Sequence, residues 1–160
     1  LSIVFLTIVI DQLTKFWVTS NMRFGQSIPS DGFFRLTYTS NTGSIFGLFP
    51  NQTLPLTILS IFAIGGLIYF YRTRILPARL KSASVGLLLG GAFGNLIDRV
   101  RHATVIDFLD VGPWPIFNIA DSAITVGIAI VLIYMLFVTK KKAAEQEKNS
   151  IDSGTSSGSS

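Results

Sequence analysis

Residues 116–139 read IFNIADSAITVGIAIVLIYMLFVT, and this stretch decides the fold class because most of its side chains are apolar. About 20 helical residues cross the roughly 30 Å hydrocarbon core of a bilayer. Three further stretches have comparable length and composition, at about 1–20, 51–71 and 82–98. The sequence therefore predicts an α-helical membrane protein with four transmembrane helices.

Composition separates the chain from soluble domains. Of its 160 residues, 49% are hydrophobic and 14% are charged, whereas charged residues make up about 25% of an ordinary soluble domain. The net charge of +4 comes from Lys and Arg that flank apolar stretches, so we expect a membrane and no nucleic acid as partner. The chain has no cysteine and one histidine, His102, which excludes disulfides, thiol nucleophiles and Cys-based or multi-His metal sites. We expect no metal and no cofactor.

The positions of Lys and Arg predict the orientation in the membrane, because cytoplasmic loops are enriched in both. Basic residues follow the second and fourth apolar stretches, at Arg72, Arg74, Arg79, Lys81, Lys140, Lys141 and Lys142. We therefore expect both termini in the cytoplasm, and residues 21–50 and 99–115 on the outer face.

The segments between and after the spans differ in character. Residues 32–40, GFFRLTYTS, alternate moderately between apolar and polar side chains, which predicts short strands with tight turns. Residues 99–115 are expected to form an outer loop. Beyond residue 142 the chain becomes polar, so we expect one membrane-embedded domain over 1–142 and a disordered tail over 143–160.

Ionisable residues inside a span are costly, and each is a candidate for function. Asp11 and Lys15 lie four residues apart on the first stretch and therefore on one helix face. An ion pair that only holds helices together and a pair that takes part in function both fit this spacing.

The third stretch carries small residues four apart, at Ser82, Gly86, Gly90 and Gly94. Such a ridge lets another helix approach closely. Asn95, Asp98 and Arg99 follow at the outer end. Capping of the helix end and contact with a ligand both account for these three residues.

The fourth stretch begins with a polar stripe formed by Asn118, Asp121, Ser122 and Thr125, which must face protein or water. The helix dipole favours an anion in the first turns, so capping alone is one explanation of Asp121. The other explanation needs a second carboxylate, and Asp107 lies close enough in sequence for the outer loop to fold it onto Asp121. Two carboxylates that share a site retain one proton between them, and the pair can activate a water as in aspartic proteases.

Asp110 is the alternative partner for Asp121. It is followed by Val111-Gly-Pro and resembles a turn residue, so spacing favours Asp107 without deciding the pairing.

Five motifs in order resemble those of the lipoprotein signal peptidase family, also called type II or prolipoprotein signal peptidases. They are Asp11-Gln-Leu-Thr-Lys15, Asn41-Thr-Gly-Ser-Ile-Phe-Gly47, Gly90-Gly-Ala-Phe-Gly-Asn-Leu-Ile-Asp-Arg99, Val105-Ile-Asp-Phe108 and Phe117-Asn-Ile-Ala-Asp-Ser122. Together the motifs cover nearly the whole chain except its tail, and the set is far more specific than any one member.

The resemblance implies an aspartic endopeptidase of the bacterial cytoplasmic (inner) membrane. It would have four transmembrane helices and a small extracytoplasmic β-cradle at about 23–50. Its substrates would be diacylglyceryl-modified prolipoproteins, cut before the lipidated cysteine near the outer face, and membrane lipids would be further partners. The resemblance also implies inhibition by globomycin, and we expect a monomer.

Carried over motif by motif, the catalytic pair falls on Asp107 and Asp121. Supporting or substrate-binding roles fall on Asn41, Gly43, Asn95, Arg99 and Asn118, and structural roles on Asp11, Lys15 and Asp98. Two departures affect details: the interval between Asp107 and Asp121 is short for the family, and Ser44-Ile45 stands where small residues are usual.

Rival functions place the same residues in other roles. A transporter would use Asp11, Lys15, Asp98 and Asp121 as a charge relay, and a scaffold would use the polar stripes only for helix packing. Serine chemistry through Ser44 or Ser122 lacks a nucleophile-elbow pattern. The transporter and the scaffold both predict that Asp107→Asn is tolerated.

Overall fold

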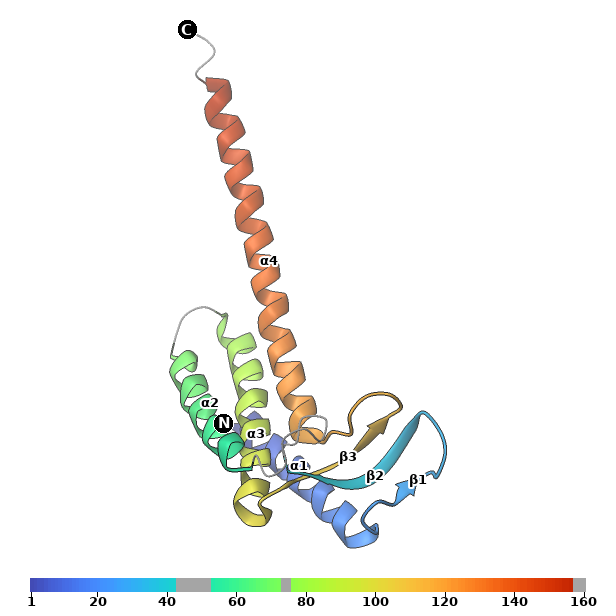
Figure 1. Ribbon diagram of the computed structural model, residues 1–160. Coiled ribbons are helices and arrows are strands. Elements are labelled where there is room, and N and C mark those ends of the chain that lie inside the picture. Colours follow the sequence, from blue (N-terminus) through green and yellow to red (C-terminus); the bar gives the residue numbers. More distant parts are fainter. Residues whose placement is uncertain (43–52, 73–75, 157–160) are drawn as a thin grey trace.

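The computed structural model describes the backbone of residues 1–42, 53–72 and 76–156, and the side chains of these residues except 70 and 139–156. The described helices are α1 (Ser2–Asn21), α2 (Thr53–Tyr71), α3 (Ala78–His102) and α4 (Ile119–Ser156), as Figure 1 shows. The segments Ser2–Asn21, Ala78–His102 and Ile119–Val138 are long and apolar enough to cross a membrane. Three predicted spans are thus confirmed as strongly apolar helices, and a membrane crossing by the shorter apolar helix α2 stays a prediction.

Helix α3 contacts each of the other three helices and is the centre of the bundle (Figure 1). The glycines of α3 allow the neighbouring helix α1 to approach closely. A Cβ added at Gly86 would lie 2.9 Å from Ile3, and one at Gly90 would lie 2.5 Å from Cβ of Thr7. The predicted small-residue ridge is therefore the surface on which α1 packs.

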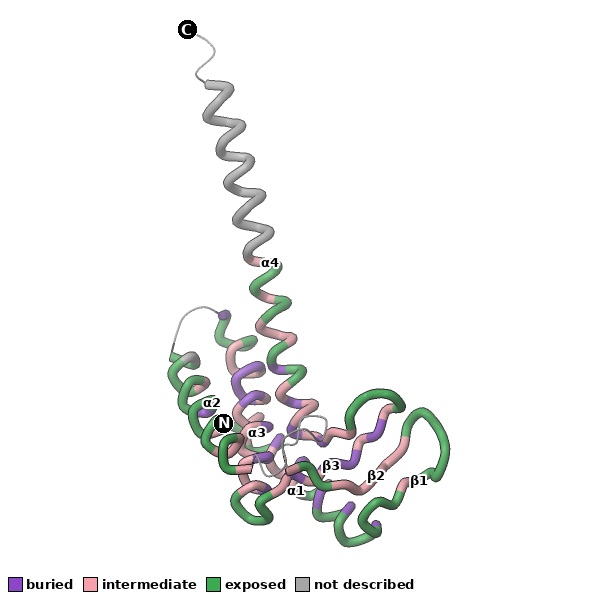
Figure 2. The backbone as a smooth tube through the Cα atoms, viewed as in Figure 1, coloured by how far each residue is buried: buried purple, intermediate pink, exposed green. Residues whose placement is uncertain are grey.

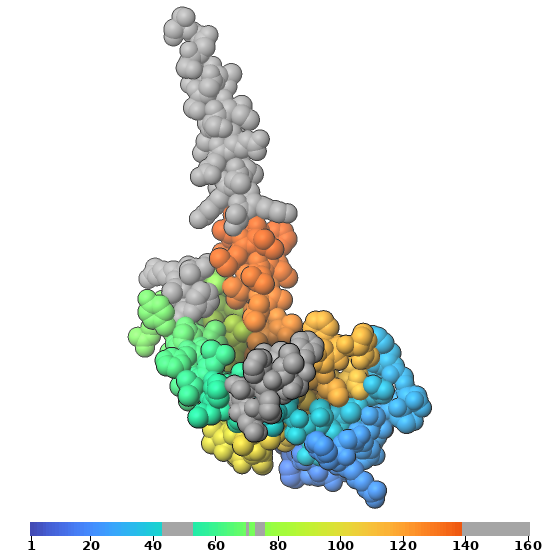
Figure 3. Space-filling model, in the orientation of Figure 1, coloured from blue at the N-terminus to red at the C-terminus, as the bar shows by residue number. Residues whose placement is uncertain are grey.

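Within the described residues, three strands form an antiparallel sheet in the order β1-β2-β3, with β1 at Ser27–Ile28, β2 at Phe34–Asn41 and β3 at Val105–Val111. In the space-filling view the sheet projects beside the helices (Figure 3). The strands predicted within 23–50 are confirmed as far as Asn41, and residues 43–50 lie outside the described part of the chain.

The prediction of an outer loop over 99–115 is wrong for most of its length. Residues 99–102 extend α3, and 105–111 form β3. Strand β2 pairs with β3 so that Leu36 lies opposite Leu109 and Thr39 lies opposite Asp107, and the register shifts between Leu36 and Thr39. Asp107 and Asp110 therefore lie in a strand, and because neighbouring side chains alternate between faces, they point to opposite sides of the sheet.

Buried residues gather along α3, on β3 and at the start of α4 (Figure 2). A small apolar cluster of Val18, Met22 and Phe108 joins the end of α1 to β3. Large apolar side chains are exposed on the outward faces of α1, α2 and α4, among them Phe5, Phe16, Phe62, Leu136 and Phe137. Exposed apolar faces of this extent are what lipid-facing helices present.

Helix α4 continues to Ser156 and extends far beyond the other helices (Figure 1). This differs from the disordered tail expected over 143–160, at least for the backbone up to residue 156. The sequence after Lys142 is AAEQEKN. Ala, Glu, Gln and Lys are good helix formers, so their intrinsic propensity favours a helix there.

Candidate active site

The polar site is built around the first turn of α4, which is closed by a reciprocal capping arrangement. The backbone N–H of Asp121 donates to Oδ1 of Asn118 at 2.9 Å, and the N–H of Asn118 donates to Oδ2 of Asp121 at 3.4 Å. Each side chain satisfies a backbone donor that the helix leaves free. The capping explanation of Asp121 is thus confirmed as one of its roles.

Strand β3 brings Asp107 to this turn. Phe117, just before the helix, exchanges backbone hydrogen bonds with Leu109 at 2.7 Å and 3.1 Å. This pairing folds the chain back, so that Nδ2 of Asn118 donates to Oδ1 of Asp107 at 2.7 Å. Asp107 is 2% exposed.

Asn95 on α3 connects the two acids from the other side. Its Nδ2 donates to Oδ1 of Asp121 at 2.8 Å, and its Oδ1 accepts from Nδ2 of Asn118 at 3.1 Å. Each carboxylate therefore accepts from one of two amides that are bonded to each other: Asp121 from Asn95, and Asp107 from Asn118. The structure brings together four predicted site residues: Asp107, Asp121, Asn95 and Asn118.

Burial raises the pKa of Asp107 to about 7, and the negative charge of Asp121 adds to the rise. Hydrogen bonds from the amides of Asn118 and Asn41, and the charge of Lys15, oppose it. A carboxyl group with such a pKa holds its proton at mildly acidic pH and loses it near neutrality. A protonated acid therefore stands beside a second carboxyl group, which suits general acid–base chemistry.

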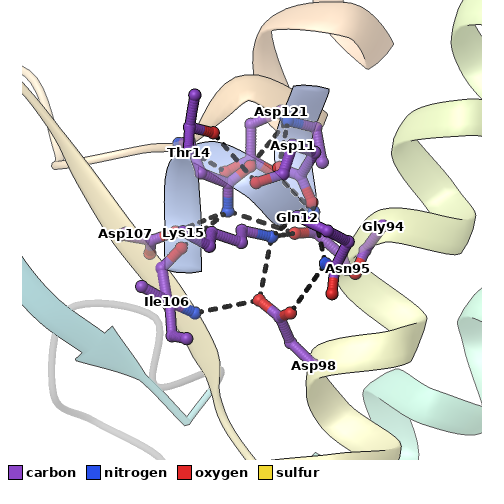
Figure 4. A network of polar contacts seen from close by, with 12 residues as sticks. Asp11, Gln12, Thr14, Lys15, Gly94, Asn95, Asp98, Ile106, Asp107 and Asp121 are labelled. Atoms are coloured by element: carbon purple, nitrogen blue, oxygen red, sulfur yellow. Dashed lines mark hydrogen bonds and ion pairs between the residues drawn. The ribbon is translucent and has the colours of Figure 1, made fainter. Parts of the chain in front are cut away.

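A buried ion trio of Asp11, Lys15 and Asp98 lies beside Asn95 (Figure 4). Nζ of Lys15 is 2.8 Å from Oδ2 of Asp11 and 2.8 Å from Oδ2 of Asp98. The predicted contact between Asp11 and Lys15 is confirmed, and Asp98 completes it. Lys15 also donates to Oδ1 of Asn95 at 3.2 Å.

The trio is tied to the sheet and to α4 by contacts that sequence analysis missed. Oδ1 of Asp11 accepts the backbone N–H of Ala120 at 2.9 Å, and Oδ2 of Asp98 accepts that of Ile106 at 3.2 Å. Gln12 donates to Oδ1 of Asp98 at 3.0 Å. Gln12 stands within the first motif and could have been found there. The contacts with Ala120 and Ile106 use backbone N–H groups, which any residue type except proline has, so the sequence does not indicate them.

Other predicted site residues have different surroundings. Arg99 donates to Oγ of Ser60 on α2 at 3.2 Å. The hydroxyls of Ser122 and Thr125 donate to backbone carbonyls of α4 itself, at 3.0 Å and 2.8 Å. Asn41, at the end of β2, does join the site through its hydrogen bond to Asp107, and Gly43 lies outside the described residues.

Asp110 is not a turn residue, contrary to the sequence interpretation. Its buried carboxylate forms an ion pair with Nη2 of Arg35 at 2.8 Å and accepts from Nε of Arg35 at 3.0 Å and from the hydroxyl of Thr37 at 2.8 Å. These contacts tie β3 to β2 on the face of the sheet opposite Asp107, which supports Asp107 as the partner of Asp121.

A pocket of about 370 Å³ opens beside Asp121 along α4. It is mainly apolar and is lined by Trp114, Phe117, Asp121, Ser122, Thr125 and Val126. An apolar chain that lies along this face of α4 would reach the carboxylate of Asp121.

Comparison with known proteins gives one consistent result. The sequence profile described as signal peptidase (SPase) II matches residues 3–137. The lipoprotein signal peptidase of Halothermothrix orenii is 39% identical over 135 residues, which cover 83% of this chain and 92% of that protein. The lipoprotein signal peptidase of Bacillus subtilis is 41% identical over 149 residues, covering 90% and 97%.

Solved structures agree with the sequence comparisons. A bacterial membrane enzyme solved by the in meso method superposes with a TM-score of 0.80 at 32% identity, over 88% of each chain. A second such structure gives a TM-score of 0.76 at 32% identity, over 84% of this chain and 90% of the other.

Proposed function

The chain belongs to the signal peptidase II, or lipoprotein signal peptidase, family, and from this premise we propose that it is an aspartic endopeptidase with Asp107 and Asp121 as its catalytic pair. Its substrates are diacylglyceryl-modified prolipoproteins, cut before the lipidated cysteine. The observation that carries the proposal is the linked pair of amides: Asn95 donates to Asp121, Asn118 donates to the buried Asp107, and the two amides are bonded to each other.

In the proposed mechanism Asp107 supplies the acid and Asp121 the base. The pKa of about 7 for Asp107 supports the first role. The contacts of Asp121 with N–H donors of Asn95 and Asn118, in the first turn of α4, support the second, because donors and the helix dipole favour an anion there. Asp121 removes a proton from water as the water oxygen bonds to the carbonyl carbon, and Asp107 protonates the carbonyl oxygen.

Breakdown of this intermediate restores the pair. The C–N bond breaks, the leaving amine takes the proton from Asp121, and the proton of one hydroxyl returns to Asp107. The products are the signal peptide with a free carboxyl group and the lipoprotein with a free amino group on its cysteine. Each acid ends in the protonation state in which it began, as repeated turnover requires.

The substrate is proposed to approach along α4. The apolar pocket lined by Trp114, Phe117 and Val126 leads to Asp121, and the signal peptide lies there while the lipid chains stay in the bilayer. The site lies at the end of α4 opposite Lys140. Because Lys and Arg are enriched in cytoplasmic segments, their positions support both termini in the cytoplasm and an active site near the outer face of the cytoplasmic membrane. On this view α2 is a fourth span, and residues 1–142 are one domain acting as a monomer.

Cleavage of a diacylglyceryl prolipoprotein, followed by gel shift, tests the catalytic pair. We expect Asp107→Asn and Asp121→Asn each to lower the rate by roughly 100-fold or more, the range of a lost general acid or base. Asp110→Asn is the matched control, since that side chain lies on the other face of β3 with Arg35, and it should retain most activity. Globomycin should block the wild-type reaction. Unimpaired cleavage by both Asp107→Asn and Asp121→Asn would exclude the mechanism.

A further inference from the structure

We propose that Lys15 is a positioning residue for the catalytic pair: by donating to Asn95, it sets the direction in which this amide presents its donors to Asp121. The inference rests on the proposed function and assigns to the buried cation a role beyond neutralising its acidic neighbours.

The argument begins with the chemistry of the two groups. An ammonium group has only donors, whereas an amide side chain has one acceptor end and one donor end. Nζ of Lys15 lies 3.2 Å from Oδ1 of Asn95. With its oxygen held toward Lys15, Asn95 must turn its NH₂ group the other way, where Oδ1 of Asp121 accepts at 2.8 Å.

The amide of Asn118 is oriented by the backbone of α4, in a direction that agrees with that of Asn95. Oδ1 of Asn118 accepts the backbone N–H of Asp121 at 2.9 Å, so its NH₂ group faces Asp107 at 2.7 Å and Oδ1 of Asn95 at 3.1 Å. Reversing Asn95 would set its NH₂ against the donors of Lys15 and Asn118, and its oxygen against the carboxylate of Asp121. In this network of hydrogen bonds, only one direction of the Asn95 amide pairs every donor with an acceptor. The ammonium group of Lys15, at the end of the network, favours that direction.

The other charges around Lys15 explain why its charged group can be buried, but they do not set the direction of the Asn95 amide. Asp11 on α1 and Asp98 on α3 flank it at 2.8 Å each, and both remain paired whichever way Asn95 points. Arg99 on α3 interacts electrostatically with Asp121 and Asp107 from its own position, beside Ser60. The charge of Lys15 also opposes the rise in the pKa of Asp107, so its removal should raise that pKa further.

The test compares Lys15→Met/Asp98→Asn with Asp98→Asn alone in detergent-solubilised full-length enzyme. Compared with wild type, the double change removes one positive and one negative charge and so keeps the net charge of the trio. Compared with Asp98→Asn, it removes only the charge of Lys15. We expect kcat to fall roughly 10- to 100-fold relative to Asp98→Asn, the range for residues that orient catalytic groups. KM should stay within about twofold, because Lys15 makes no contact with the pocket. The alkaline limb of the pH–rate profile should move to higher pH, and Lys15→Arg should recover part of kcat.

A double variant with the kcat and pH profile of Asp98→Asn would overturn the proposal. If the double variant does not fold, Asn95→Ser carries the test, since it interrupts the same connection and leaves the ion trio intact. An unchanged kcat and pH profile for Asn95→Ser would likewise overturn it. Failure of the proposed function is distinct, because it appears as cleavage by Asp107→Asn and Asp121→Asn.

Discussion

At the scale of single residues, the buried carboxyl group of Asp107 supports the proposed activity but lowers the stability of the folded protein when it ionises. Its carboxyl group is buried beside Asp121, and its pKa is raised from 3.8 to about 7. The folded state therefore binds a proton that the unfolded state has already released between these two values. From this residue, stability is highest below about pH 4 and falls as pH rises toward 7, where the buried group becomes charged.

Removing the ionisation of Asp107 should therefore stabilise the protein while it abolishes cleavage. We expect Asp107→Asn to raise the midpoint of thermal unfolding in detergent at about pH 8, by an amount corresponding to roughly 2–4 kcal/mol, and to change it little at about pH 4. Asp31→Asn, at an exposed position, is the control and should change neither. Equal midpoints for Asp107→Asn and wild type at about pH 8 would contradict the raised pKa.

At the scale of elements, the packing of α1 on α3 sets the position of the ion trio. A Cβ at Gly94 would lie 2.6 Å from Oδ2 of Asp11, and one at Gly91 would meet the carbonyl oxygen of Ala120 on α4. The glycines of α3 thus bring α1 and α4 close enough for Asp11 to accept the N–H of Ala120. Helix packing and alignment of the site depend on the same residues.

The same substitution at two glycines separates packing from helix propensity. Gly90→Ala would place Cβ 2.5 Å from Thr7 and 3.1 Å from the carbonyl oxygen of Val4, whereas a Cβ at Gly66 on α2 would have nothing within 4 Å. We expect Gly90→Ala to lower the unfolding midpoint by an amount equivalent to about 1–3 kcal/mol. Gly66→Ala should raise the midpoint slightly, by an amount equivalent to about 0.5–1 kcal/mol, because Ala favours a helix more than Gly does. Similar midpoints for the two variants would show that α1 does not pack on this ridge.

Sequence patterns predicted these elements unevenly, for reasons that lie in their contacts. The apolar spans and the pair of Asp11 and Lys15 depend on local spacing, and both were recognised. The sequence predicts a loop where β3 stands, because Asp107 and Asp110 interrupt the apolar pattern of the strand and because its pairing partner is the distant β2. The bond from Ala120 to Asp11 joins residues 109 apart in sequence, and no local pattern indicates it.

At the scale of the whole molecule, the proposed orientation places the sheet and the catalytic pair outside the cytoplasm. The chain has no native cysteine, so single cysteines report position without background. Ser30→Cys, in the turn before β2, should react with a membrane-impermeant maleimide in intact spheroplasts. Ser153→Cys, near the end of the chain, should react only after the membrane is permeabilised. The reverse pattern would contradict the orientation predicted from Lys and Arg.

The central claim is that the proposed catalytic pair of Asp107 and Asp121 shares one proton, and the pH dependence of kcat with a lipidated prolipoprotein measures this most directly. A pair in which Asp107 must be protonated should lose activity on the alkaline side with an apparent pKa near 7, a value that belongs to the coupled pair. The profile should keep this midpoint in Asp110→Asn. A kcat that stays constant from about pH 5 to about pH 9 would contradict the account.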